Sequence, residues 1–286
     1  MTTPPRFPLF HRIVAIGFVA LTAGHSRTAA AAEAEPLPAP IAFSVHRKDT
    51  ASHGYEALVS LPLGYDRAPE RRWPLILFLH GSGESGHDLS HVAVNGPPKL
   101  LDPHATLTPA EQIAARILAE KFIVVSPQCP DEGIAWRNDD LLATLDGVEA
   151  KWRVDPERVY LTGLSMGGYG AWSLGLRHAH RFAAIVPVSG GANYLDALDV
   201  QDGTSPEAKA VRRAGIWIVH GAKDNVVPVS EATRLYDLFK DAGFADLRIT
   251  IVPDHGHDVW NALYADPALY DWLLQHRCSG GKSKSG

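Results

Sequence analysis

The chain has 286 residues, of which 45% are hydrophobic and 21% are charged, so it is long enough to bury a substantial core. Without its first 34 residues, which hold three arginines and one glutamate, it carries 24 basic and 31 acidic residues, a net charge of −7. This charge disfavours nucleic acid as a partner. No stretch after residue 34 is apolar for long enough to cross a membrane, so we expect no membrane association of the mature chain.

The first 34 residues resemble an export signal. A basic start at residues 6–12 precedes an apolar run at 13–23 that is too short to span a bilayer, and small residues at 29–34 offer A-x-A cleavage sites. We therefore expect a secreted or periplasmic protein that is cleaved near Ala32 or Ala34. The alternative is an uncleaved membrane anchor or a disordered tail.

From residue 35 on, apolar runs bounded by Gly and Pro alternate with longer amphipathic segments, which predicts β-α-β units. Two runs within 41–62 resemble an antiparallel pair at a sheet edge. Strands that are apolar on both faces, as in a parallel sheet covered by helices, are expected at 75–81, 122–128, 159–163, 182–190, 216–221 and 247–253. Helical spacing is found at 108–121, 139–152, 230–243 and 269–277.

Thr108 and Glu111 form a capping pattern at the start of the first of these helices. The pattern as a whole predicts one α/β domain over residues 35–278, with a mostly parallel, doubly wound sheet flanked by helices. A short Gly- and Ser-rich tail at 279–286 is expected to be disordered.

The pentapeptide GLSMG, Gly163 to Gly167, fits the pattern G-x-S-x-G at the point where a strand ends and a helix begins. A serine on such a tight turn is exposed above the sheet, and glycine neighbours let the strand and the helix approach each other. Ser165 is therefore the expected nucleophile, and the free N–H of Met166 is one expected donor of an oxyanion hole. Small residues that fill a close strand-helix contact are the alternative explanation.

A serine nucleophile requires a base and an acid that orients it, in the chain order Ser, Asp or Glu, His. Asp224 follows one predicted strand and His257 follows the last, so both lie with Ser165 at the carboxyl ends of strands. His255 is the rival base, and His257 is favoured because Gly256 lets the loop turn its imidazole toward the serine. The flanking acid at 258 is expected to stabilise the loop.

His220, at a strand end, is expected to hold the loop that carries Asp224. Earlier in the chain, the Gly-rich turn HGSGESG (80–86) follows an apolar strand, and its free amides near Ser82 and Gly83 can supply a second oxyanion donor. A flexible turn or a phosphate cradle is the alternative, but neither G-x-x-x-x-G-K-[ST] nor a dinucleotide fingerprint is present.

No metal or organic cofactor is expected, because His80, His87, His91 and His255 lack the spacing of a known zinc motif. The two cysteines, Cys129 and Cys278, can pair in an oxidising compartment if the fold brings them together, and the sequence leaves this open.

Taken together, LHGSGESG, GLSMGG, HGAKDNVVP and HGHDVW resemble the α/β-hydrolase superfamily, within it the serine esterases of the dienelactone hydrolase, phospholipase/carboxylesterase and predicted-peptidase branches. The resemblance implies Ser165 as nucleophile, His257 as base, Asp224 as its partner, and the amides of Ser82 and Met166 as the oxyanion hole. Dienelactone hydrolases use cysteine as nucleophile, so the serine argues against that particular reaction.

We expect a secreted carboxylesterase that acts through an acyl-enzyme, without a large lid domain, because only about 25 residues separate Gly190 from Ile216. Its expected partner is a small-molecule or polysaccharide-linked ester, such as a short-chain, feruloyl or acetyl ester. Trp136 and Trp260 are candidate substrate-binding walls, with core packing as the alternative. A serine peptidase of the prolyl-oligopeptidase type and a non-catalytic binding protein are the alternative functions, and the oligomeric state stays open.

Overall fold

The computed structural model describes residues 35–45, 54–130 and 135–278. Contacts divide the chain into two units, Met1–Glu35 and Pro36–Gly286, and the second unit contains the sheet and its helices. The expected export signal at 1–34 and the expected disordered tail at 279–286 lie outside the described residues.

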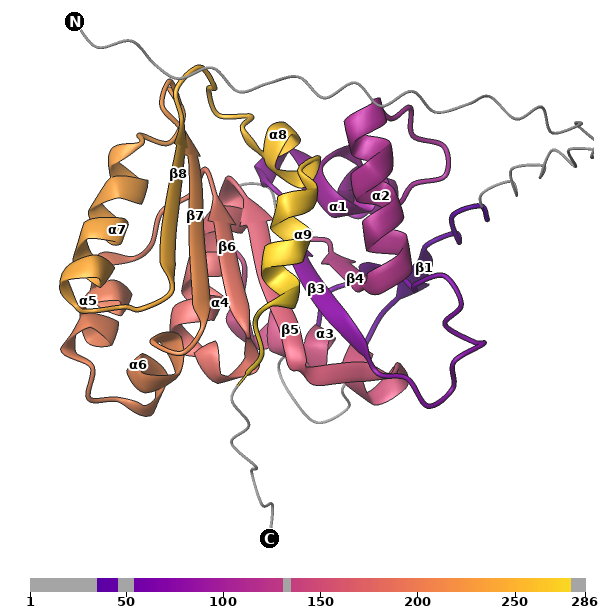
Figure 1. Cartoon of the computed structure of the whole chain (residues 1–286), viewed down its shortest axis with the longest axis horizontal. Helices are drawn as coiled ribbons and strands as arrows, with labels where there is room; N and C mark the ends of the chain where they lie inside the picture. Colours follow the sequence, from indigo (N-terminus) through magenta and orange to yellow (C-terminus); the bar gives the residue numbers. More distant parts are fainter. Residues whose placement is uncertain (1–34, 46–53, 131–134, 279–286) are drawn as a thin grey trace, which may run out of the picture. The chain divides into compact units, whose positions relative to one another are not determined.

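Eight strands form one mixed sheet in the order β1-β2-β4-β3-β5-β6-β7-β8 (Figure 1). β1 (Ile41–Phe43) and β2 (Ala57–Ser60) are antiparallel to their neighbours, as expected for the edge pair. The other six pair in parallel: β3 (Trp73–Leu79), β4 (Ile123–Pro127), β5 (Val154–Leu164), β6 (Ala184–Val188), β7 (Gly215–Gly221) and β8 (Leu247–Val252). The carboxyl ends of these six strands therefore meet at one edge of the sheet.

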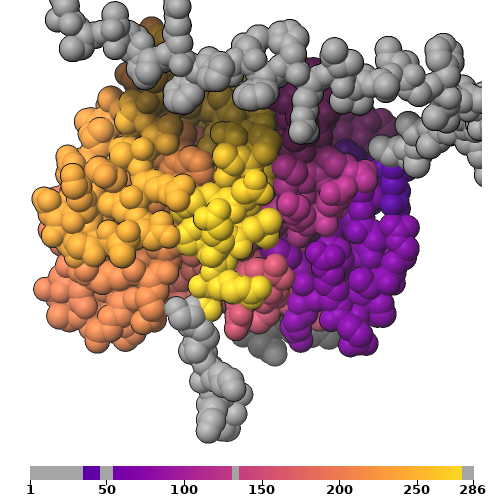
Figure 2. Space-filling view, in the orientation of Figure 1, coloured from indigo at the N-terminus to yellow at the C-terminus, as the bar shows by residue number. Residues whose placement is uncertain are grey.

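Helices cover both faces of the sheet, which confirms the predicted doubly wound α/β architecture. One face is covered by α1 (Gly96–Leu100), α2 (Pro109–Lys121), α8 (Trp260–Tyr264) and α9 (Pro267–Leu274). The other is covered by α3 (Asn138–Lys151), α4 (Met166–Arg177), α5 (Tyr194–Asp202), α6 (Pro206–Val211) and α7 (Ser230–Asp241). In the space-filling view, α9 (yellow) lies directly beside α2 (magenta) (Figure 2).

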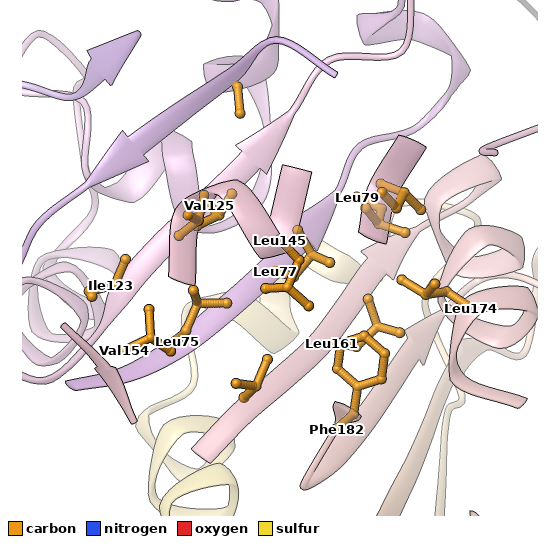
Figure 3. Packing of buried hydrophobic residues seen from close by; sticks show 14 of the residues in the cluster. Leu75, Leu77, Leu79, Ile123, Val125, Leu145, Val154, Leu161, Leu174 and Phe182 are labelled. Carbon is orange, nitrogen blue, oxygen red and sulfur yellow. The ribbon is translucent and has the colours of Figure 1, made fainter. Parts of the chain in front are cut away.

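Strand β3 shows why the parallel strands are apolar on both faces. Leu75, Leu77 and Leu79 point into the cluster that holds side chains of α3 and α4 (Figure 3), whereas Ile76 and Phe78 point into the cluster on the opposite face. All five side chains are at most 1% exposed. Each such burial contributes about 1.5–3 kcal/mol, so this strand is a main source of the stability that holds the site.

Helix α2 begins with the predicted capping box. The main-chain N–H of Thr108 donates to Glu111 Oε2 over 2.8 Å, and the N–H of Glu111 donates back to Thr108 Oγ1 over 3.3 Å. Lys99 Nζ reaches the other carboxylate oxygen of Glu111 over 2.7 Å. The hydrogen bond from Lys99 has the largest effect on the pKa of Glu111, and the bond from Thr108 has the next largest. Together they lower this pKa to about 2.

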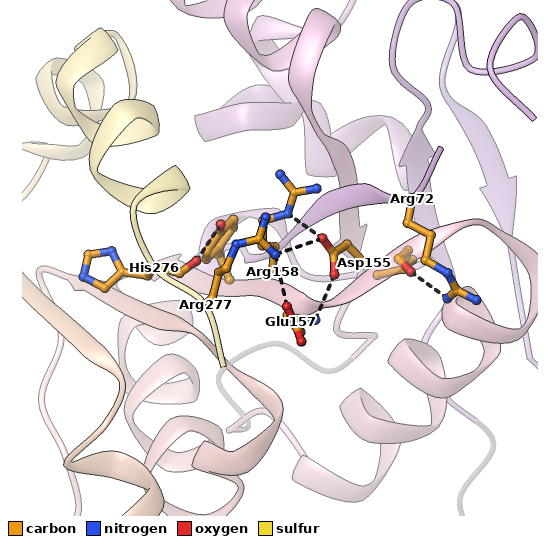
Figure 4. Close-up of polar contacts among 8 residues, drawn as sticks. Arg72, Asp155, Glu157, Arg158, His276 and Arg277 are labelled. Carbon is orange, nitrogen blue, oxygen red and sulfur yellow. Dashed lines mark hydrogen bonds and ion pairs between the residues drawn. The ribbon is translucent and has the colours of Figure 1, made fainter. Parts of the chain in front are cut away.

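Polar contacts gather around the start of β5, at the amino ends of the strands (Figure 4). Arg158 Nε donates to Asp155 Oδ2 over 2.6 Å, and Arg277 Nη1 donates to Glu157 Oε2 over 3.1 Å. The main-chain N–H of Cys278 also donates to the carbonyl of Glu157 over 2.8 Å. The last described residues are therefore held at the amino ends of the strands, whereas Ser165 lies at the carboxyl ends.

The short helices α1, α5, α6 and α8 were not predicted from the sequence, and one strand begins earlier than expected. The connection between β6 and β7 contains the short helices α5 and α6. β5 begins at Val154, five residues earlier than expected, because polar residues at its start hide the apolar strand pattern. In the described part of the chain, no helix has the length and apolar character needed to span a membrane.

Candidate active site

Ser165 lies on a sharp turn between β5, which ends at Leu164, and α4, which begins at Met166. Its φ is 52° and its ψ is −117°, a conformation that costs a non-glycine residue on the order of 1–3 kcal/mol. Two glycines make the turn possible: a Cβ on Gly163 would overlap the carbonyl of Gly167, and a Cβ on Gly167 would overlap the carbonyl of Leu79. The strand, the turn and the helix therefore present the Ser165 side chain at the carboxyl edge of the sheet.

His257 connects Ser165 to Asp224. Its Nε2 lies 2.9 Å from Ser165 Oγ, and its Nδ1 lies 2.8 Å from Asp224 Oδ2. The carboxylate of Asp224 can only accept, so Nδ1 carries the proton and Nε2 is left to accept from the serine hydroxyl. His255 does not make these contacts, so the geometry distinguishes the two histidines that the sequence left as rivals.

The carboxylate of Asp224 is completely buried and fully hydrogen-bonded. Its Oδ1 accepts from the N–H groups of Val226 and Val227, each over 2.9 Å. Burial alone would raise the pKa of Asp224, but the hydrogen bonds from His257 and from these two amides outweigh it and hold the pKa below its usual value. Asp224 therefore stays ionised.

His220 holds the same loop, as expected from the sequence. The side chain is fully buried, and Nε2 lies 2.9 Å from the carbonyl of Val227 and 3.2 Å from Asp224 Oδ2. The loop that follows β7 is thereby fixed to the end of the strand that precedes it.

The turn after β3 runs beside Ser165. An ideal Cβ on Gly81 would lie 3.5 Å from Ser165 Cβ, and the next residue, Ser82, begins the short helix η1 (Ser82–Glu84). Met166 begins α4 on the other side. The first N–H groups of a helix have no acceptor within the helix, so both positions carry amides that are able to donate to a substrate.

Buried side chains hold this turn in place. Cys129 N donates to His80 Nε2 over 3.0 Å, which leaves the proton on Nδ1, 2.6 Å from the carbonyl of Gly81. Burial lowers the pKa of His80, so the ring stays neutral and keeps this tautomer. Gln128 Nε2 also donates to the carbonyl of Glu84 over 3.2 Å. Because the Gly81 carbonyl and the Ser82 N–H belong to one planar peptide, the bond to His80 orients the Ser82 amide.

Sequence reasoning missed two polar residues at the site. Ser189 is fully buried with a φ of 47°, and its Oγ donates to the carbonyl of His257 over 3.0 Å. Glu84, 8% exposed, accepts from Asn95 Nδ2 over 2.6 Å. The only sequence signals were a serine followed by two glycines after a strand, and a single acid within the glycine-rich turn.

The two candidate tryptophans differ in their surroundings. Trp136 is 5% exposed and packs edge-on against His80 and Tyr55, so it supports the turn after β3 from within the core, the alternative that the sequence had left open. Trp260 is half-buried and packs edge-on against the His257 ring, with centroids 5.1 Å apart. Of the two tryptophans, only Trp260 packs against a member of the hydrogen-bond chain of Ser165, His257 and Asp224.

Among the described residues, no group of three or more His, Cys, Asp or Glu side chains is arranged to hold a metal ion. His87 and His91 are both exposed. Cys129 and Cys278 are not joined by a disulfide: Cys129 is buried against the α3 and α4 face of the sheet, and Cys278 packs on the opposite face.

Curated relatives match part of the chain. A probable feruloyl esterase C from Aspergillus terreus is 27% identical over 193 residues, which cover 65% of this chain and 61% of that protein. A bifunctional acetylxylan esterase/xylanase from Neocallimastix patriciarum is 28% identical over 129 residues, 43% of this chain and 18% of that protein. The aligned part therefore spans less than two thirds of either relative.

Solved structures share the fold. A thermostable esterase superimposes with a TM-score of 0.62 at 24% identity, covering 83% of this chain and 63% of that one. A ferulic acid esterase superimposes with a TM-score of 0.61 at 20% identity, covering 82% of this chain and 96% of that one. The family model for phospholipase/carboxylesterase matches residues 67–266, more than half of the chain. The chain thus belongs to the phospholipase/carboxylesterase family of α/β-hydrolases.

Proposed function

We propose that the protein hydrolyses carboxylic esters through an acyl-enzyme on Ser165, with His257 as general base and Asp224 as its partner. The observation that carries this proposal is the continuous hydrogen-bond chain from Ser165 Oγ through both ring nitrogens of His257 to Asp224. The ionised state of Asp224 supports it, because a carboxylate stabilises the imidazolium that forms when the serine is deprotonated.

In this mechanism Ser165 Oγ attacks the ester carbonyl while His257 Nε2 takes its proton. The amides of Ser82 and Met166 donate to the oxyanion of the tetrahedral intermediate. His257 then gives its proton to the departing alcohol, which leaves the acyl group on Ser165. A water molecule, deprotonated by His257, attacks the acyl-enzyme, and collapse of the second intermediate releases the acid and restores Ser165.

For the substrate, we propose short-chain or cell-wall esters with an acetyl or feruloyl group. The activities named for the two relatives, an acetylxylan esterase/xylanase and a probable feruloyl esterase, support this class. The short β6–β7 connection, with only α5 and α6, also supports a site open to an ester carried on a large molecule.

Hydrolysis of p-nitrophenyl acetate, p-nitrophenyl butyrate and methyl ferulate tests the proposal. The wild type should turn over at least one of them, and Ser165→Ala should fall to the background rate while its circular dichroism spectrum stays that of the wild type. A fluorophosphonate should label the wild type and not the variant. Equal rates for the two proteins would refute the assignment of Ser165, and turnover of peptide anilides in place of esters would favour a peptidase.

We also propose that the protein is exported and cleaved near Ala32 or Ala34. The basic start and short apolar run of residues 1–34 support this. N-terminal sequencing of the protein recovered from the periplasm or medium of an expressing cell tests it, and an intact residue 1 would contradict it.

A further inference from the structure

Four side chains form a continuous layer on the rim of the site, which we call the tyrosine layer: Tyr169, Tyr194, Glu231 and Arg234. They come from α4, α5 and α7, which approach one another on the same side of the sheet. None of them has a role in the mechanism proposed above.

The layer starts next to the nucleophile. Tyr169 follows Ser165 by one helical turn, and its N–H donates to the carbonyl of Ser165 over 3.1 Å. An ideal Cβ on Gly191 would lie 3.0 Å from Tyr169 Cε1 and 2.6 Å from Glu231 Oε2, so both side chains meet over this glycine. The side chains of Tyr169 and Glu231 therefore pack directly over the Gly191 backbone, and a larger residue at 191 would displace them.

The layer continues outward from Glu231. Arg234 Nη2 donates to Glu231 Oε2 over 2.7 Å, and its guanidinium carbon lies 5.0 Å from the centroid of the Tyr194 ring. The ion pair is held within one helix, and the cation lies near a second aromatic ring. Two aromatic rings with a carboxylate and a guanidinium between them are thus fixed in one surface.

Two side chains of the tyrosine layer belong to the small set of large hydrophobic residues that are exposed. Among the described residues, seven large hydrophobic side chains are exposed, and four of them follow the carboxyl ends of β5, β6 and β7. These four are Tyr169 at 40%, Tyr194 at 48%, Leu195 at 72% and Val226 at 64% exposed. Two of the four, Tyr169 and Tyr194, belong to the tyrosine layer, where their exposed rings are accessible to a ligand.

The hydroxyl of Tyr169 remains a donor at the pH at which the triad works. Burial raises its pKa, the carboxylates of Glu231 and Asp224 raise it further, and Arg234 opposes them. A neutral phenol and a guanidinium can donate, and a carboxylate can accept, at the edge of an aromatic surface.

We propose that the tyrosine layer binds a saccharide that forms the alcohol half of the ester, with sugar faces on Tyr169 and Tyr194 and hydroxyls on Glu231 and Arg234. This rests on the proposed function. The exposure of the rings favours the alcohol half over an aromatic acyl group, because an acyl group beside Ser165 can be enclosed, whereas a sugar in a polymer must lie on an open surface.

The experiment compares two ester pairs that share an acyl group and differ in the alcohol. The acetyl pair is p-nitrophenyl acetate and an acetylated xylo-oligosaccharide, and the feruloyl pair is methyl ferulate and a feruloylated arabino-oligosaccharide. The measured quantity is the ratio of kcat/KM for the saccharide ester to kcat/KM for the small ester. In Tyr194→Ala this ratio should fall about tenfold because one stacking contact with the sugar is lost. The fall should come from a higher KM for the saccharide ester.

Tyr194→Phe keeps the ring and should keep the ratio near that of the wild type. Ile113→Ala is the matched control, since Ile113 is 57% exposed on α2, which covers the opposite face of the sheet. Free xylotriose should inhibit hydrolysis of p-nitrophenyl acetate by the wild type, and several-fold less strongly in Tyr194→Ala.

An unchanged ratio in Tyr194→Ala overturns the proposal. An equal loss of kcat/KM for methyl ferulate and for the feruloylated oligosaccharide also overturns the proposal, because it would assign the layer to the acyl group. A wild type that cleaves the small esters but no saccharide ester overturns the saccharide subsite and leaves the esterase assignment intact. A wild type that cleaves no ester at all refutes the proposed function itself.

Discussion

Ser189 Oγ donates a hydrogen bond of 3.0 Å to the main-chain carbonyl of His257. Ser189 follows β6, whereas His257 follows β8, so the bond crosses over the end of β7, which lies between them in the sheet. It fixes the backbone of the loop from which the imidazole reaches both Ser165 and Asp224. A serine outside the hydrogen-bond chain of Ser165, His257 and Asp224 thus holds the loop of the proposed base.

Replacing Ser189 by Ala should lower kcat about five- to tenfold, since a buried hydrogen bond contributes roughly 1 kcal/mol. Ser189→Gly loses the same bond but relaxes the φ of 47°, so it should unfold at higher urea concentration than Ser189→Ala. Steady-state kinetics and urea denaturation of both variants provide the measurement. Equal kcat in wild type and Ser189→Ala would show that the loop holds its position without this bond.

Asp224→Asn should reduce kcat by about 10⁴ with little change in the fold, because an amide next to Nδ1 favours the wrong tautomer of His257. The change can be measured on p-nitrophenyl acetate, with circular dichroism as the test of folding. Asp258→Asn is the control, since Asp258 is an exposed acid in the loop that carries His257. A comparable loss of kcat in both variants would mean that the negative charge near the loop, and not the tautomer of His257, determines the rate.

Glu84 should act through the turn that carries the Ser82 amide. Glu84→Ala removes the acceptor for Asn95 and should lower kcat about tenfold, less than the 10² to 10³ that typically follows loss of an oxyanion donor. Glu84→Gln keeps an acceptor oxygen for Asn95 and should retain most of the activity. If kcat falls equally in both variants, the negative charge of Glu84 is the important feature and the hydrogen bond is not.

Glu111 should make stability depend on pH at the acid end. Its pKa is lowered to about 2 in the folded protein, so its contribution is complete above the ordinary value near 4.5 and is lost as the pH falls through about 2. The difference in free energy of unfolding between wild type and Glu111→Gln should therefore be largest near pH 6 and vanish near pH 2.

Urea denaturation at pH 6, 4 and 2.5 measures this difference. Glu120→Gln serves as the control, since Glu120 lies on the same helix in an exposed pair with Arg116. A difference for Glu111→Gln that stays constant with pH would contradict the low pKa.

The sequence predicted the α/β architecture because the parallel strands are apolar on both faces and glycines mark their ends, as Leu75 to Leu79 followed by the HGSGESG turn illustrates. It also grouped Ser165, Asp224 and His257, because each follows the carboxyl end of a strand. Whether Ser165, Asp224 and His257 carry out catalysis stays a prediction until the variants are measured.

The sequence could not identify contacts that join distant segments. Ser189 and Glu84 have no local pattern that distinguishes them from other serines and acids in loops, since their role depends on His257 and Asn95. Trp136 and Trp260 were equivalent in the sequence because burial depends on the assembled fold. The early start of β5 was missed since its first residues are polar and bind the end of the chain.

The hydrogen bond between Cys278 and Glu157 has a practical consequence for handling the protein. Ser165 follows the carboxyl end of β5, whereas Glu157 lies near its amino end, so a linker that continues from Cys278 starts on the far side of the molecule. Immobilisation on a solid support through the C-terminus should therefore turn the Ser165 end of the sheet toward the surrounding solution, where a large dissolved or suspended ligand can reach it.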